Sequence, residues 1–107
     1  MAQAVKVKVE TKMRRTRAKL LDDADPLEVV VYVDFVPRGS GNRNLARRVA
    51  QAFRTDPLLK DHVIKATAGA TRVTIRFRAS LDAVRAVMDY QQRARELLDQ
   101  EQLKLAF

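Results

Sequence analysis

Residues 27–36, Leu-Glu-Val-Val-Val-Tyr-Val-Asp-Phe-Val, form the stretch that decides the fold. β-Branched and aromatic residues dominate it, as they do in strands. Alternation places Val29, Val31, Val33 and Phe35 on one face and the more polar set Val30, Tyr32, Asp34 and Val36 on the other. The sequence therefore predicts a strand whose first face belongs to a core.

Downstream of this strand, two helices and a hairpin are predicted. Asn42 is a good N-cap for a helix that ends at Thr55-Asp56-Pro57. We expect Leu45, Val49, Ala52 and Phe53 to face the core, because they recur at helical spacing. Residues 63–68 and 71–78 indicate a hairpin around Gly69-Ala70, and Ser80 is a predicted cap for the last helix.

Upstream of residue 27 the pattern is less regular. Val5, Val7 and Val9 alternate with Lys6 and Lys8, which is typical of a short strand. The basic stretch 12–21 fits either a helical turn or two or a mobile arm. We therefore expect a basic N-terminal extension over 1–26 and a single α+β domain over 27–107. The expected fold is a three-stranded antiparallel sheet covered on one face by two helices, with an extension that can add a short strand.

Composition excludes several function classes. The 107 residues carry a net charge of +8 and contain one His and no Cys, so disulfides, thiol catalysis and thiolate metal sites are excluded. Neither His62 nor the serines Ser40 and Ser80 have an evident catalytic partner, and Gly39-Ser40-Gly41 lacks the spacing of a phosphate-binding loop. We expect a non-enzymatic, cytoplasmic protein without a cofactor or a membrane segment.

The positive charge points to nucleic acid as a partner. Alternation in the hairpin makes Arg72, Arg76 and Arg78 project from one sheet face, where their guanidiniums could pair with phosphates. Base stacking is not supported, because Tyr32 is the only plausible stacking ring. The competing interpretation is an ordinary solvated charged face. The candidate nucleic-acid-binding residues are Arg14, Arg15, Arg17, Lys19, Arg43, Arg47, Lys65, Arg72, Arg76 and Arg78.

The last helix carries more apolar residues than a small core needs. Such an excess indicates either a contact with a second chain or a simple core with a frayed end. The candidate interface residues are Val84, Val87, Met88, Tyr90, Gln91, Leu97 and Leu98.

From residue 27 onward the chain resembles the small dimerising subunit of the KEOPS complex, called EKC in eukaryotes, with the LAGE/ESO proteins as relatives. The matching pieces are soft as motifs but follow the family's order over about 75 of the 107 residues. They are the strand 28–36, the helix Leu45-Ala-Arg-Arg-Val-Ala-Gln-Ala-Phe53, Asp56-Pro57-Leu58-Leu59, the strand Arg72-Val-Thr-Ile-Arg-Phe-Arg-Ala79 and Leu81-Asp-Ala-Val-Arg85.

The resemblance implies a scaffold without chemistry of its own. Two such subunits, identical or paralogous, would pair and dock their helices on a threonylcarbamoyl-transferase catalytic subunit that modifies adenosine in tRNA. A kinase-like subunit would belong to the same complex, and this chain would help to hold the tRNA. The alternatives are a free-standing basic RNA- or DNA-binding module and an interaction domain whose charge serves solubility.

Overall fold

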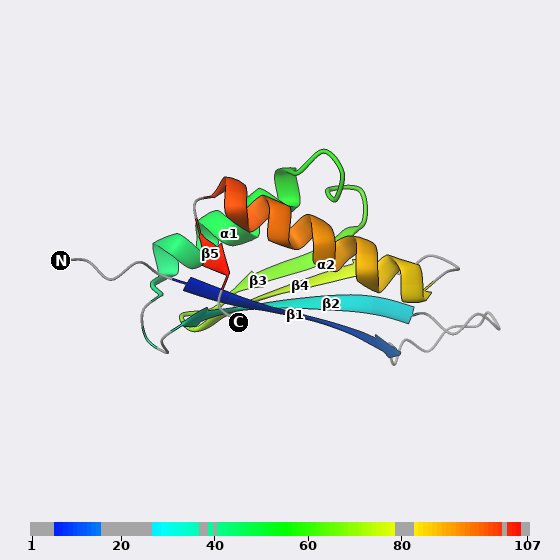
Figure 1. Cartoon of the computed structure of the whole chain (residues 1–107), viewed down its shortest axis with the longest axis horizontal. Coiled ribbons are helices and arrows are strands. Elements are labelled where there is room, and N and C mark those ends of the chain that lie inside the picture. The colour runs from blue at the N-terminus through cyan, green and yellow to red at the C-terminus, as the bar shows by residue number, and fades with distance from the viewer. Residues whose placement is uncertain are drawn as a thin grey trace.

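The fold is one sheet with both helices packed on the same face (Figure 1). The computed structural model describes residues 6–15, 27–36, 39, 41–78, 83–101 and 103–105. The sheet order is β3-β4-β2-β1-β5, with four antiparallel strands and a fifth that runs parallel to β1. The elements are β1 (Lys6–Arg15), β2 (Leu27–Val36), α1 (Arg43–Thr55), β3 (Val63–Ala68), β4 (Arg72–Arg78), α2 (Ala83–Gln100) and β5 (Lys104–Leu105).

Strand β2 lies in the middle of the sheet because its apolar residues suit a site covered by neighbours on both sides. It pairs with β1 along its whole length and with β4 from Glu28 to Asp34. Val29, Val31, Val33 and Phe35 are buried in the core as the alternation predicts. The α+β class, the hairpin of β3 and β4, and the two helices on one sheet face are confirmed.

Strand β1 is longer than the sequence suggests. A strand was expected over 5–9, but β1 runs to Arg15, and every residue from Lys6 has a partner on β2. Residues 11–15 have only a weak strand pattern of their own, but their pairing with the strongly β-forming β2 makes them part of the strand. Arg14 and Arg15 are therefore part of the sheet and not of an arm, whereas Arg17 and Lys19 lie outside the described residues.

Helix α1 begins as expected but is rotated slightly from the expected phase. The Asn42 Oδ1 accepts a hydrogen bond from the Leu45 amide at 2.8 Å, which confirms the cap. Val49 and Phe53 are buried, but Ala46 and Ala50 complete the buried face, and Leu45 and Ala52 are only half-buried. The small alanines let the helix lie close to β3 and β4, the strands that it covers.

Helix α2 covers the other half of the sheet, over β1 and β2. This placement corrects part of the predicted partner interface: Tyr90, Leu97 and Leu98 are core residues of this chain, because they fill the space above the sheet. The half-buried Val87 packs against the same core, and Gln91 accepts a hydrogen bond from the Thr11 hydroxyl. Met88 is 67% exposed, and the side chain of Val84 lies outside the described part.

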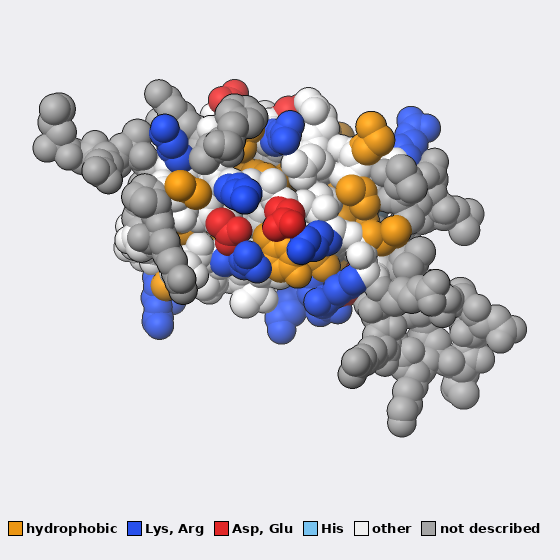
Figure 2. Space-filling model, turned by 60° about the horizontal axis from the view of Figure 1, so that its bottom comes forward, with side chains coloured by type: hydrophobic (Ala, Val, Ile, Leu, Met, Phe, Trp, Pro, Cys, Tyr) orange, Lys and Arg blue, Asp and Glu red, His pale blue; other side chains and the backbone are white. Residues whose placement is uncertain are grey.

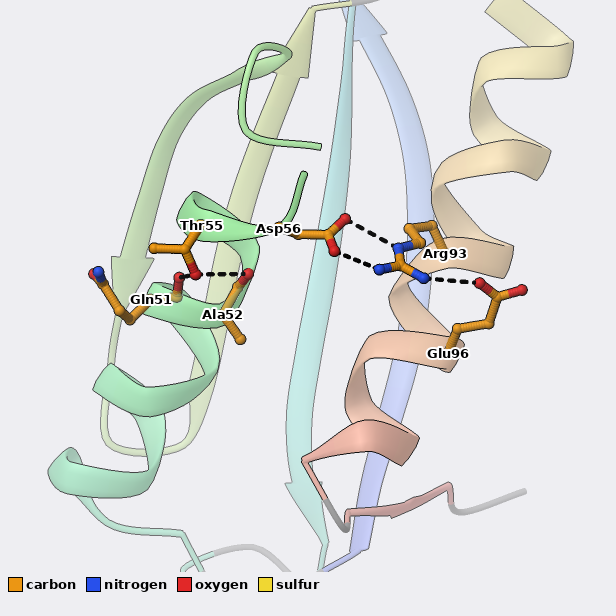
Figure 3. Close-up of polar contacts among 6 residues, drawn as sticks. All are labelled: Gln51, Ala52, Thr55, Asp56, Arg93 and Glu96. Atoms are coloured by element: carbon orange, nitrogen blue, oxygen red, sulfur yellow. Dashed lines mark hydrogen bonds and ion pairs between the residues drawn. The ribbon is translucent and has the colours of Figure 1, made fainter. Parts of the chain in front are cut away.

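A buried ion pair ties the end of α1 to α2 (Figure 3). The Asp56 side chain is nearly inaccessible, and its carboxylate accepts two hydrogen bonds from Arg93, the one from Nε at 3.0 Å. Hydrogen bonds from Arg93 hold the pKa of Asp56 below its ordinary value even though burial acts against this, and the Leu58 and Leu59 amides lower it further. Arg93 also donates to the exposed Glu96 at 3.1 Å.

Asp56→Asn should destabilise the protein by about 3 kcal/mol, because it leaves the Arg93 cation without its buried counter-charge. Glu96→Gln is the matched control, since Glu96 bonds the same guanidinium from an exposed position, and its effect on stability should be much smaller than that of Asp56→Asn. Urea unfolding at neutral pH measures both losses. Equal losses would show that Asp56–Arg93 does not hold the helices together.

Removing residues 1–15 should abolish cooperative unfolding, because β2 would lose the strand that pairs with all ten of its residues. Circular dichroism during heating is the measurement. Met13→Ala in the full chain is the control and should change stability by about 0.5 kcal/mol or less, because Met13 is an exposed residue of the same strand. A shortened chain that still melts cooperatively would contradict an integral β1.

Candidate nucleic-acid interface

The sheet face turned away from the helices, here called the open face, carries most of the charge of the sheet. Among the side chains that the structure describes, register and alternation place eleven charged ones on it, eight of them cationic and three anionic. Figure 2 shows blue Lys and Arg side chains on the side of the molecule in view, with a few red carboxylates between them. The cations are Lys6, Lys8, Lys12, Arg14, Lys65, Arg72, Arg76 and Arg78, and the anions are Glu10, Glu28 and Asp34.

Arg72 is committed to a neighbour on the open face. Its Nε and Nη2 donate to the two carboxylate oxygens of Asp34 at 2.6 and 3.2 Å, which is a bidentate pair. Its guanidinium carbon also lies 4.6 Å from the ring centroid of Tyr32, in a cation–π contact. Neither Arg72 nor the Tyr32 ring is therefore free to receive a nucleic acid without giving up an existing contact.

Glu28 is a buried carboxylate held between two arginines. Its side chain is 1% exposed, and it accepts hydrogen bonds from Arg76 Nη2 at 2.8 Å and from Arg14 Nε at 2.6 Å. Hydrogen bonding to Arg76 is the main cause that lowers the pKa of Glu28; burial opposes it, and Arg14 adds to it. Because a lone buried carboxylate is costly, Arg14 and Arg76 serve the stability of the sheet first.

Four open-face cations remain without a carboxylate partner among the described residues: Lys6, Lys8, Lys65 and Arg78. All four side chains are exposed. Lys12 pairs with Glu10 at 3.3 Å on the surface, and such exposed pairs contribute little to stability. Lys6, Lys8, Lys65 and Arg78 are therefore the groups that can bind a polyanion without first giving up an ion pair with a described carboxylate.

The predicted nucleic-acid-binding residues thus do not all lie on the open face. It brings Arg14, Lys65, Arg72, Arg76 and Arg78 onto one face, as expected for the hairpin residues. Arg43 and Arg47 are exposed on α1, in the helical layer, and therefore do not belong to this face. Two other α1 arginines have partners there, since Arg48 pairs with Glu101 at 3.3 Å and Arg54 donates to the Ala66 carbonyl.

Sequence reasoning missed six of the charged members of the face: Lys6, Lys8, Glu10, Lys12, Glu28 and Asp34. The alternation of residues 5–9 already set Lys6 and Lys8 apart from the valines, and extending that alternation would have reached Lys12. The roles of Glu28 and Asp34 depend on register, because only the pairing of β2 with β4 shows that they meet Arg76 and Arg72. No local signal in the sequence specifies that pairing.

The described residues contain little else that suggests chemistry. No group of three or more metal-ligating side chains occurs among them, and none of the described helices is long and apolar enough to cross a membrane. Gly41 is explained by packing, because a Cβ there would lie 2.3 Å from Cδ2 of Phe35. Comparisons of the chain with models of protein families, with curated proteins and with solved structures found no match.

Glu28→Gln should destabilise the protein by about 2 kcal/mol at neutral pH, because it removes the charge that two guanidiniums neutralise. The pKa of Glu28 is lowered from 4.5 in the folded chain, so its contribution is present above that pH and is lost as pH falls through the folded value. The difference between wild type and variant should therefore shrink on acidification.

Urea unfolding at neutral pH and at about pH 3 tests this dependence on pH. Glu10→Gln is the control, because Glu10 is paired on the same face but is accessible, and it should cost under about 1 kcal/mol. A Glu28→Gln loss that is equally large in acid would contradict the role given to the carboxylate.

Proposed function

We propose that this chain is a non-catalytic RNA-binding protein that holds the phosphate backbone on its open face, as a scaffold subunit of a tRNA-modifying assembly. The observation that carries the proposal is the set of four exposed open-face cations with no described carboxylate partner, Lys6, Lys8, Lys65 and Arg78. They come from three strands of one hydrogen-bonded sheet, so a bound nucleic-acid strand would meet cations that the pairing already holds on one face.

The geometry favours phosphate contact over base recognition. Lys6 and Lys8 are two residues apart on one strand, which separates them by roughly 7 Å along the sheet. The only aromatic ring on the described open face, Tyr32, is covered by Arg72, so the face lacks the free rings on which single-stranded bases stack. We therefore expect binding with weak sequence preference and strong dependence on salt.

The scaffold part of the proposal depends on the family resemblance. From β2 to α2 the elements follow the order β-α-β-β-α with both helices on one face, which agrees with the fold that the resemblance implies. The proposed partners are a second copy or a paralogue, a threonylcarbamoyl-transferase catalytic subunit, a kinase-like subunit and tRNA. The exposed outer side of α2 around Met88 is the surface left for protein contact, since Tyr90, Leu97 and Leu98 are in the core.

Purification of the chain with its partners from its source cells, after nuclease treatment, tests the scaffold role. Mass spectrometry should identify a threonylcarbamoyl transferase and a small kinase. Recovery of the chain alone, or with nucleic acid only when nuclease is omitted, would instead favour the free-standing RNA- or DNA-binding module. Recovery of unrelated proteins with no affinity for nucleic acid would favour the interaction domain.

The double variant Lys8→Glu/Lys65→Glu should weaken tRNA binding at least about tenfold and make the dependence of log K on log salt shallower by about 1.4. Both lysines are exposed and have no described partner, so the thermal transition should barely move. Reversal of Arg72 and Arg76 is a poorer test than the sequence suggests, because it would place a carboxylate beside Asp34 or the buried Glu28.

Arg43→Glu/Arg47→Glu is the matched control: it changes the net charge equally but lies in the helical layer. It should leave most of the tRNA affinity intact. Equal losses in the two double variants would show that binding follows total charge and not the open face. Fluorescence anisotropy over a range of salt concentrations measures both quantities.

A further inference from the structure

A cavity of about 500 Å³ opens where β4 ends, between α2 and the segment that leads from α1 into β3. Its volume is within the range of small-molecule sites in proteins. Leu59, Ala86 and Tyr90 are the buried members of its lining, whereas Leu58 and His62 are exposed at its rim. Charged side chains complete the lining: Arg78, Arg85, Asp89 and Arg93.

The aromatic part of this cavity is held in place. The Tyr90 ring stacks on Phe77 with centroids 4.5 Å apart and planes 18° apart, and its hydroxyl donates to the Arg78 carbonyl at 2.9 Å. The His62 ring lies 6.2 Å from the Tyr90 ring at 50°. Two rings and the Leu58 side chain thus border one space, which suits a flat, partly apolar group.

The charge of the lining favours an anion. Among the described residues, three arginines and one acidic residue, Asp89, line the cavity. Arg93 is engaged by Asp56, and Arg85 lies 3.7 Å from Asp89, so these two belong to existing pairs. Arg78 has no carboxylate partner among the described residues. Its carbonyl accepts from Tyr90 on the cavity side, whereas strand alternation directs its side chain to the open face, so its guanidinium can receive a phosphate at the outer edge of the cavity.

Arg78 also connects the cavity to the open face. It is the last residue of β4 and follows Arg76 on that face, and Arg76 is opposite Lys65 of β3. We propose that the cavity binds a single nucleotide, with the base against Tyr90 and His62 and the phosphate at Arg78. The inference extends the proposed RNA binding and rests on it where the nucleotide is an unpaired residue of an RNA chain; a free nucleotide has the same chemistry.

Amide chemical shifts of the full chain during titration with AMP, adenosine and inorganic phosphate test the site. AMP should shift the amides of residues 58–63 and 85–93 and bind at least about fivefold more tightly than either fragment, because it alone supplies both a ring and a phosphate. Inorganic phosphate binding as well as AMP, or AMP shifts confined to other residues, would overturn the proposal.

Leu58→Glu and Met88→Glu form a matched pair of variants. The two side chains are 65% and 67% exposed and acquire the same charge, but only Leu58 lines the cavity. Leu58→Glu should weaken AMP binding at least about fivefold, whereas Met88→Glu should leave it unchanged. Equal effects of the two substitutions on AMP binding would overturn the proposal. Because both residues are exposed, neither substitution should unfold the protein, so weaker binding could not be attributed to unfolding.

A single-stranded RNA and an abasic chain of the same length identify the source of the nucleotide. If the RNA chain supplies it, Leu58→Glu should weaken RNA binding but not binding of the abasic chain. If only AMP binding is weakened, the site serves a free nucleotide. Failure of the open-face proposal gives a different result, because Lys8→Glu/Lys65→Glu would then leave binding of both chains unchanged.

Discussion

The pair between Asp56 and Arg93 is the constraint on which the arrangement of the molecule depends. The helices cover different halves of the sheet, α1 over β3 and β4 and α2 over β1 and β2, and they contact each other little. Asp56 ends α1, bonds to α2 and receives the amides of the segment that leads into β3. One carboxylate therefore sets the gap between the helices, the start of the hairpin and the walls of the cavity beside Tyr90.

On the open face, arginine and lysine have different tasks. Arg14, Arg72 and Arg76 bind the carboxylates of β2 through directed hydrogen bonds, and two of these arginines, Arg14 and Arg76, hold the buried Glu28. The planar guanidinium suits this work, whereas lysine is a mobile, hydrated charge. Lys6, Lys8 and Lys65 accordingly remain in solvent. Net charge thus overstates the charge available to a ligand, because part of it stabilises the sheet itself.

Local chemistry made some elements predictable. The alternation of residues 27–36 and 72–78, the Asn42 cap and the stop at Asp56-Pro57 appear where expected, because each depends on a few adjacent residues. The length of β1 did not follow from its sequence, since residues 11–15 gain their strand from β2. The carboxylate partners of Arg72 and Arg76 and the burial of Tyr90, Leu97 and Leu98 depend on contacts between distant elements, which no local pattern encodes.

The open face and the exposed side of α2 differ in charge in a way that would suit the proposed scaffold, which holds RNA and protein together. Among the described side chains, eight cations and three anions lie on the open face, whereas the exposed side of α2 mixes Arg85 and Arg95 with Asp89, Glu96 and Asp99. A polyanion is drawn to the first surface and gains little from the second. Because α1 and α2 occupy only one side of the sheet, a protein seated on the helices would leave the lysines of the open face accessible to RNA.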